Sequence, residues 1–134
     1  MLDFKEILKN KELKATQQRL VILNQLDILK HIDIDGLYEN IIDKLPTLSK
    51  ATLYRNINEL IEKNIINEIK VNNKKTLYEI TKEPHIHLVC KVCGSVMDNM
   101  CDISPLEEKI SSKSDFKIES SNVIFNGTCH NCLK

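Results

Sequence analysis

PTLSKATLYRNINELI, residues 46–61, is the stretch that decides the fold of the first half of the chain. Ser49 is placed to cap a helix, because its hydroxyl can accept a hydrogen bond from the N–H groups of the first turn. Apolar residues then recur at i, i+4, i+7 and i+8, which buries one face of that helix. They are Leu53, Ile57, Leu60 and Ile61. The helix therefore presents polar and aromatic side chains, Tyr54 and Arg55 among them, on its other faces.

Two amphipathic helices are expected ahead of this stretch, with a shorter helix over residues 4–9 before them. One should begin after a cap at Thr16, and the next after a cap at Asp33. The latter should run as far as Pro46, because proline cannot continue a helix. The short connection from Pro46 to the helix capped by Ser49 favours a helix-turn-helix.

The period of the apolar residues changes after the third of these helices. Residues 65–71 and 76–80 are typical of two strands, joined by the polar turn NNKK at 72–75. Helices followed by a two-stranded ribbon predict a winged helix-turn-helix domain over residues 1–80. A helical bundle with a surface hairpin is the alternative.

A second module is expected over residues 85–134, after a linker at residues 81–84. Its predicted strands are 86–90, 96–100 and one or two more within 116–125. Between them, SPLE at 104–107 predicts the start of a helix, with Ser104 as the cap and Glu107 completing a capping box. Strands and helices in separate stretches of the chain give the α+β fold class.

Two CxxC pairs, CKVC and CHNC, are the strongest chemical signal in the sequence. They can place four thiolates, from Cys90, Cys93, Cys129 and Cys132, around one tetrahedral Zn²⁺. Two disulfides or free thiols are the alternative, but the sequence shows no apolar signal-peptide region that would indicate an oxidising compartment. A fifth cysteine, Cys101, is expected to be a small buried side chain rather than a reactive thiol.

A second set of possible metal ligands offers nitrogen and oxygen. His85 and His87 are two residues apart on an expected strand, so their imidazoles share one face. Asp98 lies on the expected neighbouring strand, Glu79 ends the predicted wing, and His31 comes just before the cap at Asp33. Such a set suits Fe²⁺, Mn²⁺ or Zn²⁺. Taken alone, the two strand histidines could equally be ordinary surface residues.

The charges of the chain balance, because 19 Lys and Arg residues stand against 19 Asp and Glu residues in 134. The whole-chain charge therefore gives no sign of a nucleic-acid partner, although a local basic face can coexist with it. No apolar run approaches the length of a membrane span, so no membrane partner is expected. The expected location is the cytoplasm.

Four segments make the chain similar to the ferric uptake regulator family of metal-dependent bacterial repressors. They are LKATQQR (13–19), HIDIDGLY (31–38), SKATLYRN (49–56) and HIHLVCKVCG (85–94). The resemblance implies a winged-helix DNA-binding domain, a C-terminal α/β dimerisation domain, and a homodimer that binds double-stranded operator DNA. It implies a repressor and no enzyme.

The resemblance also implies the roles of individual residues. Structural zinc is expected on Cys90, Cys93, Cys129 and Cys132. A regulatory Fe²⁺ or Mn²⁺ is expected between the domains, on His31, Glu79, His85, His87 and Asp98. DNA contacts are expected from Ser49, Lys50, Thr52, Tyr54 and Arg55, with Lys14 and Arg19 at phosphate or in the minor groove. Ordinary surface charge is the alternative for Lys14 and Arg19.

The signal that the regulator senses is predicted from positions at which subgroups of the family differ in their residues. Peroxide-responsive members resemble this chain in having Asp at the position of Asp98, and their bound Fe²⁺ reacts with H₂O₂; His31 and His85 are the residues expected to be oxidised. Glu79 instead resembles the iron-uptake regulators. An auxiliary site common in iron- and zinc-uptake regulators is missing, because Pro84, Ile86 and Thr128 stand where its ligands are expected. The sequence therefore predicts a peroxide sensor, with an iron-responsive regulator as the alternative.

Two further function classes compete with this prediction. A small zinc hydrolase would use the His/Asp set with an open coordination position. The sequence supplies no HExxH helix for it, and the winged helix would have no purpose. A redox protein using the CxxC thiols is disfavoured because both pairs have the spacing of metal ligands.

Overall fold

The computed structural model describes residues 3–71, 73–81, 84–119 and 121–134. The chain divides into two compact units, Met1–Thr81 and Lys82–Lys134. Residue 72 of the predicted turn and residues 82–83 of the predicted linker lie outside the described residues. Within the described ranges, no helix has both the length and the apolar character needed to cross a membrane.

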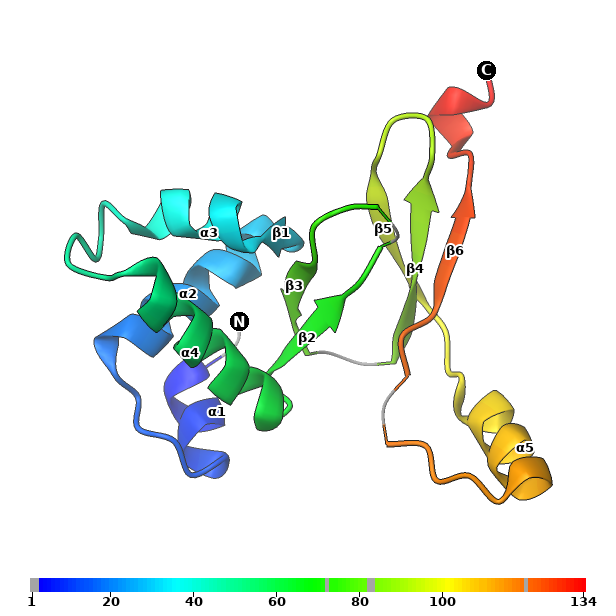
Figure 1. Cartoon of the computed structure of the whole chain (residues 1–134), viewed down its shortest axis with the longest axis horizontal. Coiled ribbons are helices and arrows are strands. Elements are labelled where there is room, and N and C mark those ends of the chain that lie inside the picture. The colour runs from blue at the N-terminus through cyan, green and yellow to red at the C-terminus, as the bar shows by residue number, and fades with distance from the viewer. Residues whose placement is uncertain (1–2, 72, 82–83, 120) are drawn as a thin grey trace. The chain divides into compact units, whose positions relative to one another are not determined.

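The N-terminal unit packs its helices against a small antiparallel sheet (Figure 1). Its elements are α1 (Phe4–Asn10), α2 (Gln17–Leu29), β1 (Ile32–Asp33), α3 (Ile34–Ile41), α4 (Lys50–Glu62), β2 (Ile66–Ile69) and β3 (Leu77–Ile80). The strand order is β1-β3-β2. The core is aliphatic, and Leu23, Leu26, Leu37, Leu53 and Ile57 are fully buried in it. With α3 and α4 as the helix-turn-helix and β2 and β3 as the wing, the predicted winged helix is confirmed.

The three helix caps predicted in the N-terminal unit are confirmed by hydrogen bonds. The Thr16 hydroxyl accepts one from the Arg19 N–H at 3.2 Å, and the Ser49 hydroxyl accepts one from the Thr52 N–H at 3.1 Å. The Asp33 carboxylate accepts a hydrogen bond from the Gly36 N–H at 2.7 Å. Each cap satisfies a backbone donor that the first helical turn leaves unpaired.

Two details of the N-terminal unit differ from the sequence expectation. α3 ends at Ile41 rather than at Pro46, and the chain then turns so that Leu45 and Leu48 are buried outside the helix. The two-residue strand β1 was not predicted. It pairs Ile32 with Tyr78 of β3, and so short a strand leaves no alternation for a sequence pattern to reveal.

The C-terminal unit is a three-stranded sheet with one α-helix. Its elements are β4 (His85–Cys90), β5 (Val96–Met100), α5 (Ser104–Ser114), β6 (Ile124–Gly127) and the 3-10 helix η1 (His130–Cys132). β4 is the central strand, antiparallel to β5 and parallel to β6. The α+β fold class is therefore confirmed.

The expected capping box of the C-terminal unit is wrong. The N-cap of α5 is Ile103 rather than Ser104, and the Ser104 N–H donates to the Asp102 carboxylate at 2.9 Å. Glu107 closes no capping box, because its carboxylate accepts a hydrogen bond from the Ser121 hydroxyl at 2.7 Å. Within 116–125, β6 supplies one of the one or two expected strands, beginning at Ile124, and the described residues before it form no strand.

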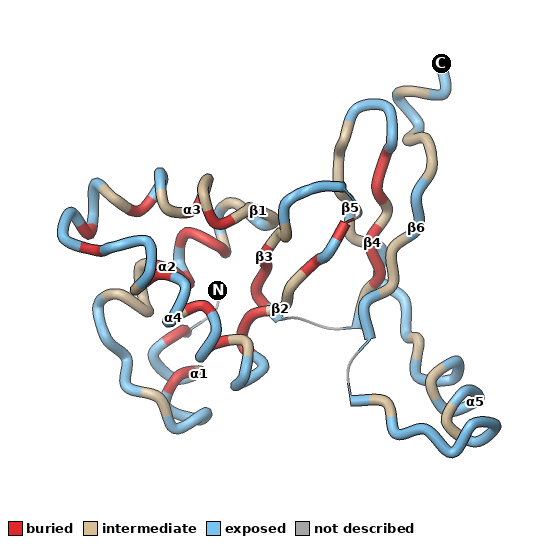
Figure 2. The backbone as a smooth tube through the Cα atoms, in the orientation of Figure 1, coloured by how far each residue is buried: buried red, intermediate tan, exposed pale blue. Residues whose placement is uncertain are grey.

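Very little of the C-terminal unit is buried. Among its described residues only Ile86, His87, Val89 and Cys90 are buried, all on β4, and α5 has no buried residue (Figure 2). A unit of this size rarely supplies a sufficient hydrophobic core without a metal or a partner chain. We therefore expect a bound metal, a partner chain or both to stabilise the C-terminal unit.

Candidate metal centres and nucleic-acid interface

Four cysteine side chains meet at one end of the C-terminal sheet. Cys90 ends β4, Cys93 lies in the turn before β5, and Cys129 and Cys132 border or belong to η1. Their sulfur atoms all lie within 4.8 Å of one another. Cys93 Sγ and Cys129 Sγ are 3.8 Å apart, and two sulfurs each about 2.3 Å from one tetrahedral Zn²⁺ would be separated by about the same distance. No cysteine is in a disulfide. The cluster fits structural zinc.

The backbone around Cys90 favours the ionised form that binds metal. The N–H groups of Cys129 and Cys93 point at Cys90 Sγ from 3.3 and 3.5 Å. The hydrogen bonds from Cys93 and then from Cys129 lower the pKa of Cys90 to about 6. Gly94 makes this turn possible, because its φ of 79° lies in the left-handed region that favours glycine.

The other thiols show why the cluster needs a cation. The Ser95 hydroxyl, 3.2 Å from Cys93 Sγ, lowers the pKa of Cys93. The hydrogen bond with Cys129, together with burial, raises the pKa of Cys132 to about 12. Four neighbouring thiolates repel one another, so all four ionise together only around a positive charge. Ser95 was missed by the sequence analysis, since a hydroxyl two residues after a cysteine carries no distinctive signal.

The N-terminal unit holds two of the predicted regulatory ligands side by side. The antiparallel pairing of Ile32 with Tyr78 carries His31 to a position opposite Glu79. His31 Nε2 and Glu79 Oε1 are 3.3 Å apart, and two ligand atoms on one metal ion at about 2.0–2.2 Å are separated by a similar distance. Glu79 is only 1% exposed, and a carboxylate is buried at such depth only with a charge or hydrogen-bond partner. The unpredicted strand β1 therefore places His31.

The C-terminal unit holds the other three predicted ligands. β4 and β5 pair His87 directly with Asp98, and His87 Nε2 lies 3.3 Å from Asp98 Oδ1. His85 shares that face, as predicted; its ring centroid is 4.7 Å from that of His87, and its Nε2 is 4.0 Å from Asp98 Oδ1. Two imidazoles and a carboxylate within this space suit a first-row divalent metal.

The predicted DNA-contacting residues gather at the start of α4. Ser49, Lys50, Tyr54 and Arg55 are exposed, and Thr52 is half-buried. The Arg55 guanidinium donates a hydrogen bond to the Thr52 hydroxyl at 3.0 Å, and the Lys50 ammonium pairs with Asp35 of α3. Tyr54, at 42% exposure, presents its ring to solvent. This end of α4 therefore combines positive charge with an accessible aromatic ring.

Lys14 and Arg19 are placed differently from each other. Lys14 is exposed ahead of α2. The Arg19 guanidinium is directed into the unit, where it donates to the Lys14 carbonyl at 2.9 Å and to the Glu59 carboxylate of α4 at 2.6 Å. Arg19 therefore ties α2 to α4, a role that the sequence analysis missed because Glu59 is 40 residues away.

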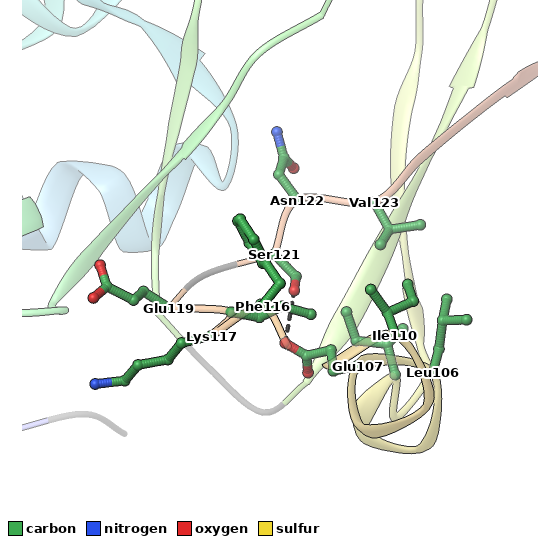
Figure 3. A pocket seen from close by; sticks show the side chains of 11 residues that line it. Leu106, Glu107, Ile110, Phe116, Lys117, Glu119, Ser121, Asn122 and Val123 are labelled. Carbon is green, nitrogen blue, oxygen red and sulfur yellow. Dashed lines mark hydrogen bonds between the residues drawn. The ribbon is translucent and has the colours of Figure 1, made fainter. Parts of the chain in front are cut away.

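A cavity of about 550 Å³ opens between α5 and residues 116–119 and 121–123 (Figure 3). Apolar side chains of Leu106, Ile110 and Phe116 line it, and the Glu107–Ser121 hydrogen bond crosses it. It contains none of the predicted metal ligands. Cys101, just ahead of α5, is exposed, so its expected burial is wrong for this unit.

Comparison with known proteins agrees with the resemblance seen in the sequence. The sequence model of the ferric uptake regulator family matches residues 10–126. The "Ferric uptake regulation protein" of Bordetella parapertussis is 30% identical over 131 residues, covering 95% of this chain and 94% of the relative. The "Peroxide operon regulator" of Bacillus subtilis is 26% identical over 131 residues, covering 96% and 90%.

A solved structure shares both the fold and the sequence pattern. The crystal structure of the Campylobacter jejuni peroxide stress regulator is 36% identical and matches with a TM-score of 0.76, covering 98% of this chain and all of the other. Because the family match spans most of the sequence, the chain belongs to the ferric uptake regulator family of metal-responsive transcription regulators, which are not enzymes.

Proposed function

We propose that this regulator is a peroxide-responsive repressor that binds operator DNA as a homodimer in the cytoplasm. The observation that carries the proposal is Asp98, a short carboxylate that β5 sets directly opposite His87. The 36% identity to the peroxide stress regulator of Campylobacter jejuni supports it. The test is DNA binding by Fe²⁺-loaded protein before and after H₂O₂.

The regulatory metal is proposed to join the two units. His31 and Glu79 belong to the first unit, while His85, His87 and Asp98 belong to the second. A metal bound by both sets restricts the angle between the units, so metal affinity becomes coupled to the shape that binds DNA. Within each unit the paired ligand atoms are already 3.3 Å apart, so little reorganisation is needed on either side.

An iron-responsive regulator is the second candidate. Glu79 favours it, because peroxide sensors often carry Asp there. The loss of the auxiliary ligands, at Pro84, Ile86 and Thr128, favours the peroxide sensor. Both candidates use the same metal site and the same DNA interface, so exposure to peroxide separates them.

DNA recognition is proposed to depend on Tyr54 and Arg55 of α4. We expect Tyr54→Ala and Arg55→Ala each to weaken binding to operator DNA by about 1–3 kcal/mol, because each loses a base or backbone contact in the major groove. Binding is measured by fluorescence anisotropy with Mn²⁺-loaded protein. Lys63→Ala, which removes a charge at the far end of the same helix, is the control. Operator affinity equal to wild type in both α4 variants would refute the assignment.

The homodimer is proposed to form through the C-terminal unit, because its apolar residues are exposed there. Leu106 and Ile110 of α5 are 53% and 45% exposed, and Phe116 is 64% exposed. A monomeric protein rarely exposes apolar side chains grouped in this way.

Charge placed on this surface should break the dimer. We expect the double variant Leu106→Asp, Ile110→Asp to elute with half the mass of wild type in light-scattering chromatography, because two carboxylates cannot be desolvated in an apolar interface. Zinc content should stay at one per chain. Ser112→Asp, on an exposed polar position of α5, is the control. A double variant with the dimer mass would place the interface elsewhere.

A further inference from the structure

We propose that Asp35 sets the DNA specificity of this regulator by holding Lys50 and Lys75 on its carboxylate whenever the chain is not seated on its operator. The inference rests on the proposed DNA-binding function. It gives Asp35 and Lys75, which the sequence analysis did not single out, a defined part in that function.

The geometry joins three elements of the N-terminal unit at one carboxylate. Asp35 is the second residue of α3, and its Oδ1 accepts a hydrogen bond from the Nζ of Lys50, the first residue of α4. Its Oδ2 accepts one from the Nζ of Lys75, in the connection between β2 and β3. The carboxylate therefore binds one lysine from the recognition helix and one from the wing.

The two lysines are where DNA phosphates would be expected. Lys50 lies one helical turn before Tyr54, so the two share a face of α4. The Tyr54 hydroxyl is among the groups near enough to Lys50 and to Lys75 to raise the pKa of each ammonium group. Recognition helix and wing are the parts of a winged helix that approach DNA, and lysines beside the base-reading residues meet the backbone.

The carboxylate keeps its charge at neutral pH. The hydrogen bonds from Lys50 and then from Lys75 lower the pKa of Asp35 to about 2. Asp35 in turn raises the pKa of both lysines. The Asp35 carboxylate therefore competes with DNA phosphate for the two lysines. Its single negative charge cancels half of the positive charge that Lys50 and Lys75 would otherwise offer to DNA.

The exposure of the group makes exchange with phosphate easy. The side chains of Lys50, Lys75 and Asp35 are 47%, 65% and 36% exposed. Ion pairs this exposed contribute little to folding stability, so stability does not account for a carboxylate shared by two lysines on the proposed DNA face.

Exchange should favour the operator over other sequences. On operator DNA, the base contacts of α4 hold the protein in register, and both lysines are delivered to phosphates. On other sequences the protein is held only by long-range charge, and the lysines stay with Asp35. The carboxylate therefore weakens non-specific binding more than operator binding, which raises the ratio between them.

The test compares Asp35→Asn with wild type, both as full-length Mn²⁺-loaded protein. The probes are a random-sequence duplex and the duplex that in-vitro selection with the wild-type protein enriches. We expect affinity for the random duplex to rise at least about threefold, with a salt dependence steeper by about 0.9 in log–log slope, because one more phosphate is neutralised. Affinity for the selected duplex should rise less.

Two further variants separate this role from general effects of charge and folding. Asp27→Asn removes an equal charge from another Asp–Lys pair, that of Asp27 in α2 with Lys30, and should leave the slope unchanged. Adding Lys75→Gln to Asp35→Asn should remove much of the gain on random DNA.

Each remaining outcome has a clear consequence. Three outcomes would show that Asp35 does not set specificity in this way. They are an Asp35→Asn protein with unchanged affinity and salt dependence, one whose affinity rises equally for both duplexes, and one that no longer binds DNA. If wild type itself enriches and binds no duplex with metal present, the proposed DNA-binding function fails, and this inference fails with it.

Discussion

Zinc loss and dissociation of the dimer are the expected result of replacing Cys93 with serine. The variant removes one of four sulfurs, and the remaining three cannot close a tetrahedral site. Among the described residues of the C-terminal unit only residues of β4 are buried, so we expect the metal to supply much of the free energy that holds β4, β6 and η1 together. Structural zinc contributes about 10–16 kcal/mol in small metal-dependent domains, far more than this unit can replace. Metal analysis, light-scattering chromatography and circular dichroism measure the three effects.

Cys101→Ser is the matched control for Cys93→Ser. It makes the same chemical change at an exposed cysteine that is outside the four-sulfur cluster. We expect it to keep one zinc per chain and the dimer mass. A Cys93→Ser protein that is folded, dimeric and zinc-loaded would contradict the assignment, and so would wild type that stays folded and dimeric after complete removal of zinc.

The parts of the fold that were predictable rest on local signals. Thr16, Asp33 and Ser49 each cap a helix through an oxygen that reaches a backbone N–H three residues on, so the sequence contains the whole interaction. The CxxC pairs were equally informative, because the spacing of two cysteines around a turn is itself typical of metal ligands.

The parts that failed depend on contacts between distant residues. β1 exists only because β3 pairs with it across 45 residues of sequence, and nothing within Ile32–Asp33 shows this. The SPLE pattern predicts a capping box. In the structure, however, the Glu107 carboxylate accepts a hydrogen bond from the Ser121 hydroxyl, and the Ser104 N–H donates to the Asp102 carboxylate. In both places a contact with another residue, which a local sequence pattern does not identify, overrides the local preference for secondary structure.

The candidate sites show the same division. His85 and His87 share a face because strand geometry requires it, and Asp98 follows from the hairpin. The adjacency of His31 and Glu79 depends on the missed strand β1, so only the family resemblance could supply it. No sequence pattern indicates the pairing of Asp35 with its two lysines, because Lys50 and Lys75 are 15 and 40 residues away from it in the sequence.

Loss of DNA binding together with oxidation of a histidine is the expected effect of H₂O₂ on the Fe²⁺-loaded protein. When bound, Fe²⁺ supplies the electron that cleaves the O–O bond of H₂O₂ beside its ligands. The imidazoles of His31 and His85 are in the proposed ligand set, so they meet the oxidant before it can diffuse away. The His31 side chain is 13% exposed and that of His85 is 5% exposed, which leaves little water to intervene. Mass spectrometry should find one added oxygen on either residue, in step with DNA release.

Two controls make the oxidation result decisive. Mn²⁺-loaded protein should keep its DNA and its histidines under the same peroxide, because Mn²⁺ does not readily reduce H₂O₂. Asp98→Glu should keep metal-dependent DNA binding but respond less to peroxide, since the longer carboxylate changes the side chain that faces His87 while preserving its charge. Fe²⁺-loaded protein that retains DNA and unmodified histidines under peroxide would reject the peroxide sensor. The iron-responsive regulator would then take its place, because Glu79 and the other ligands would still bind the metal without reporting the oxidant.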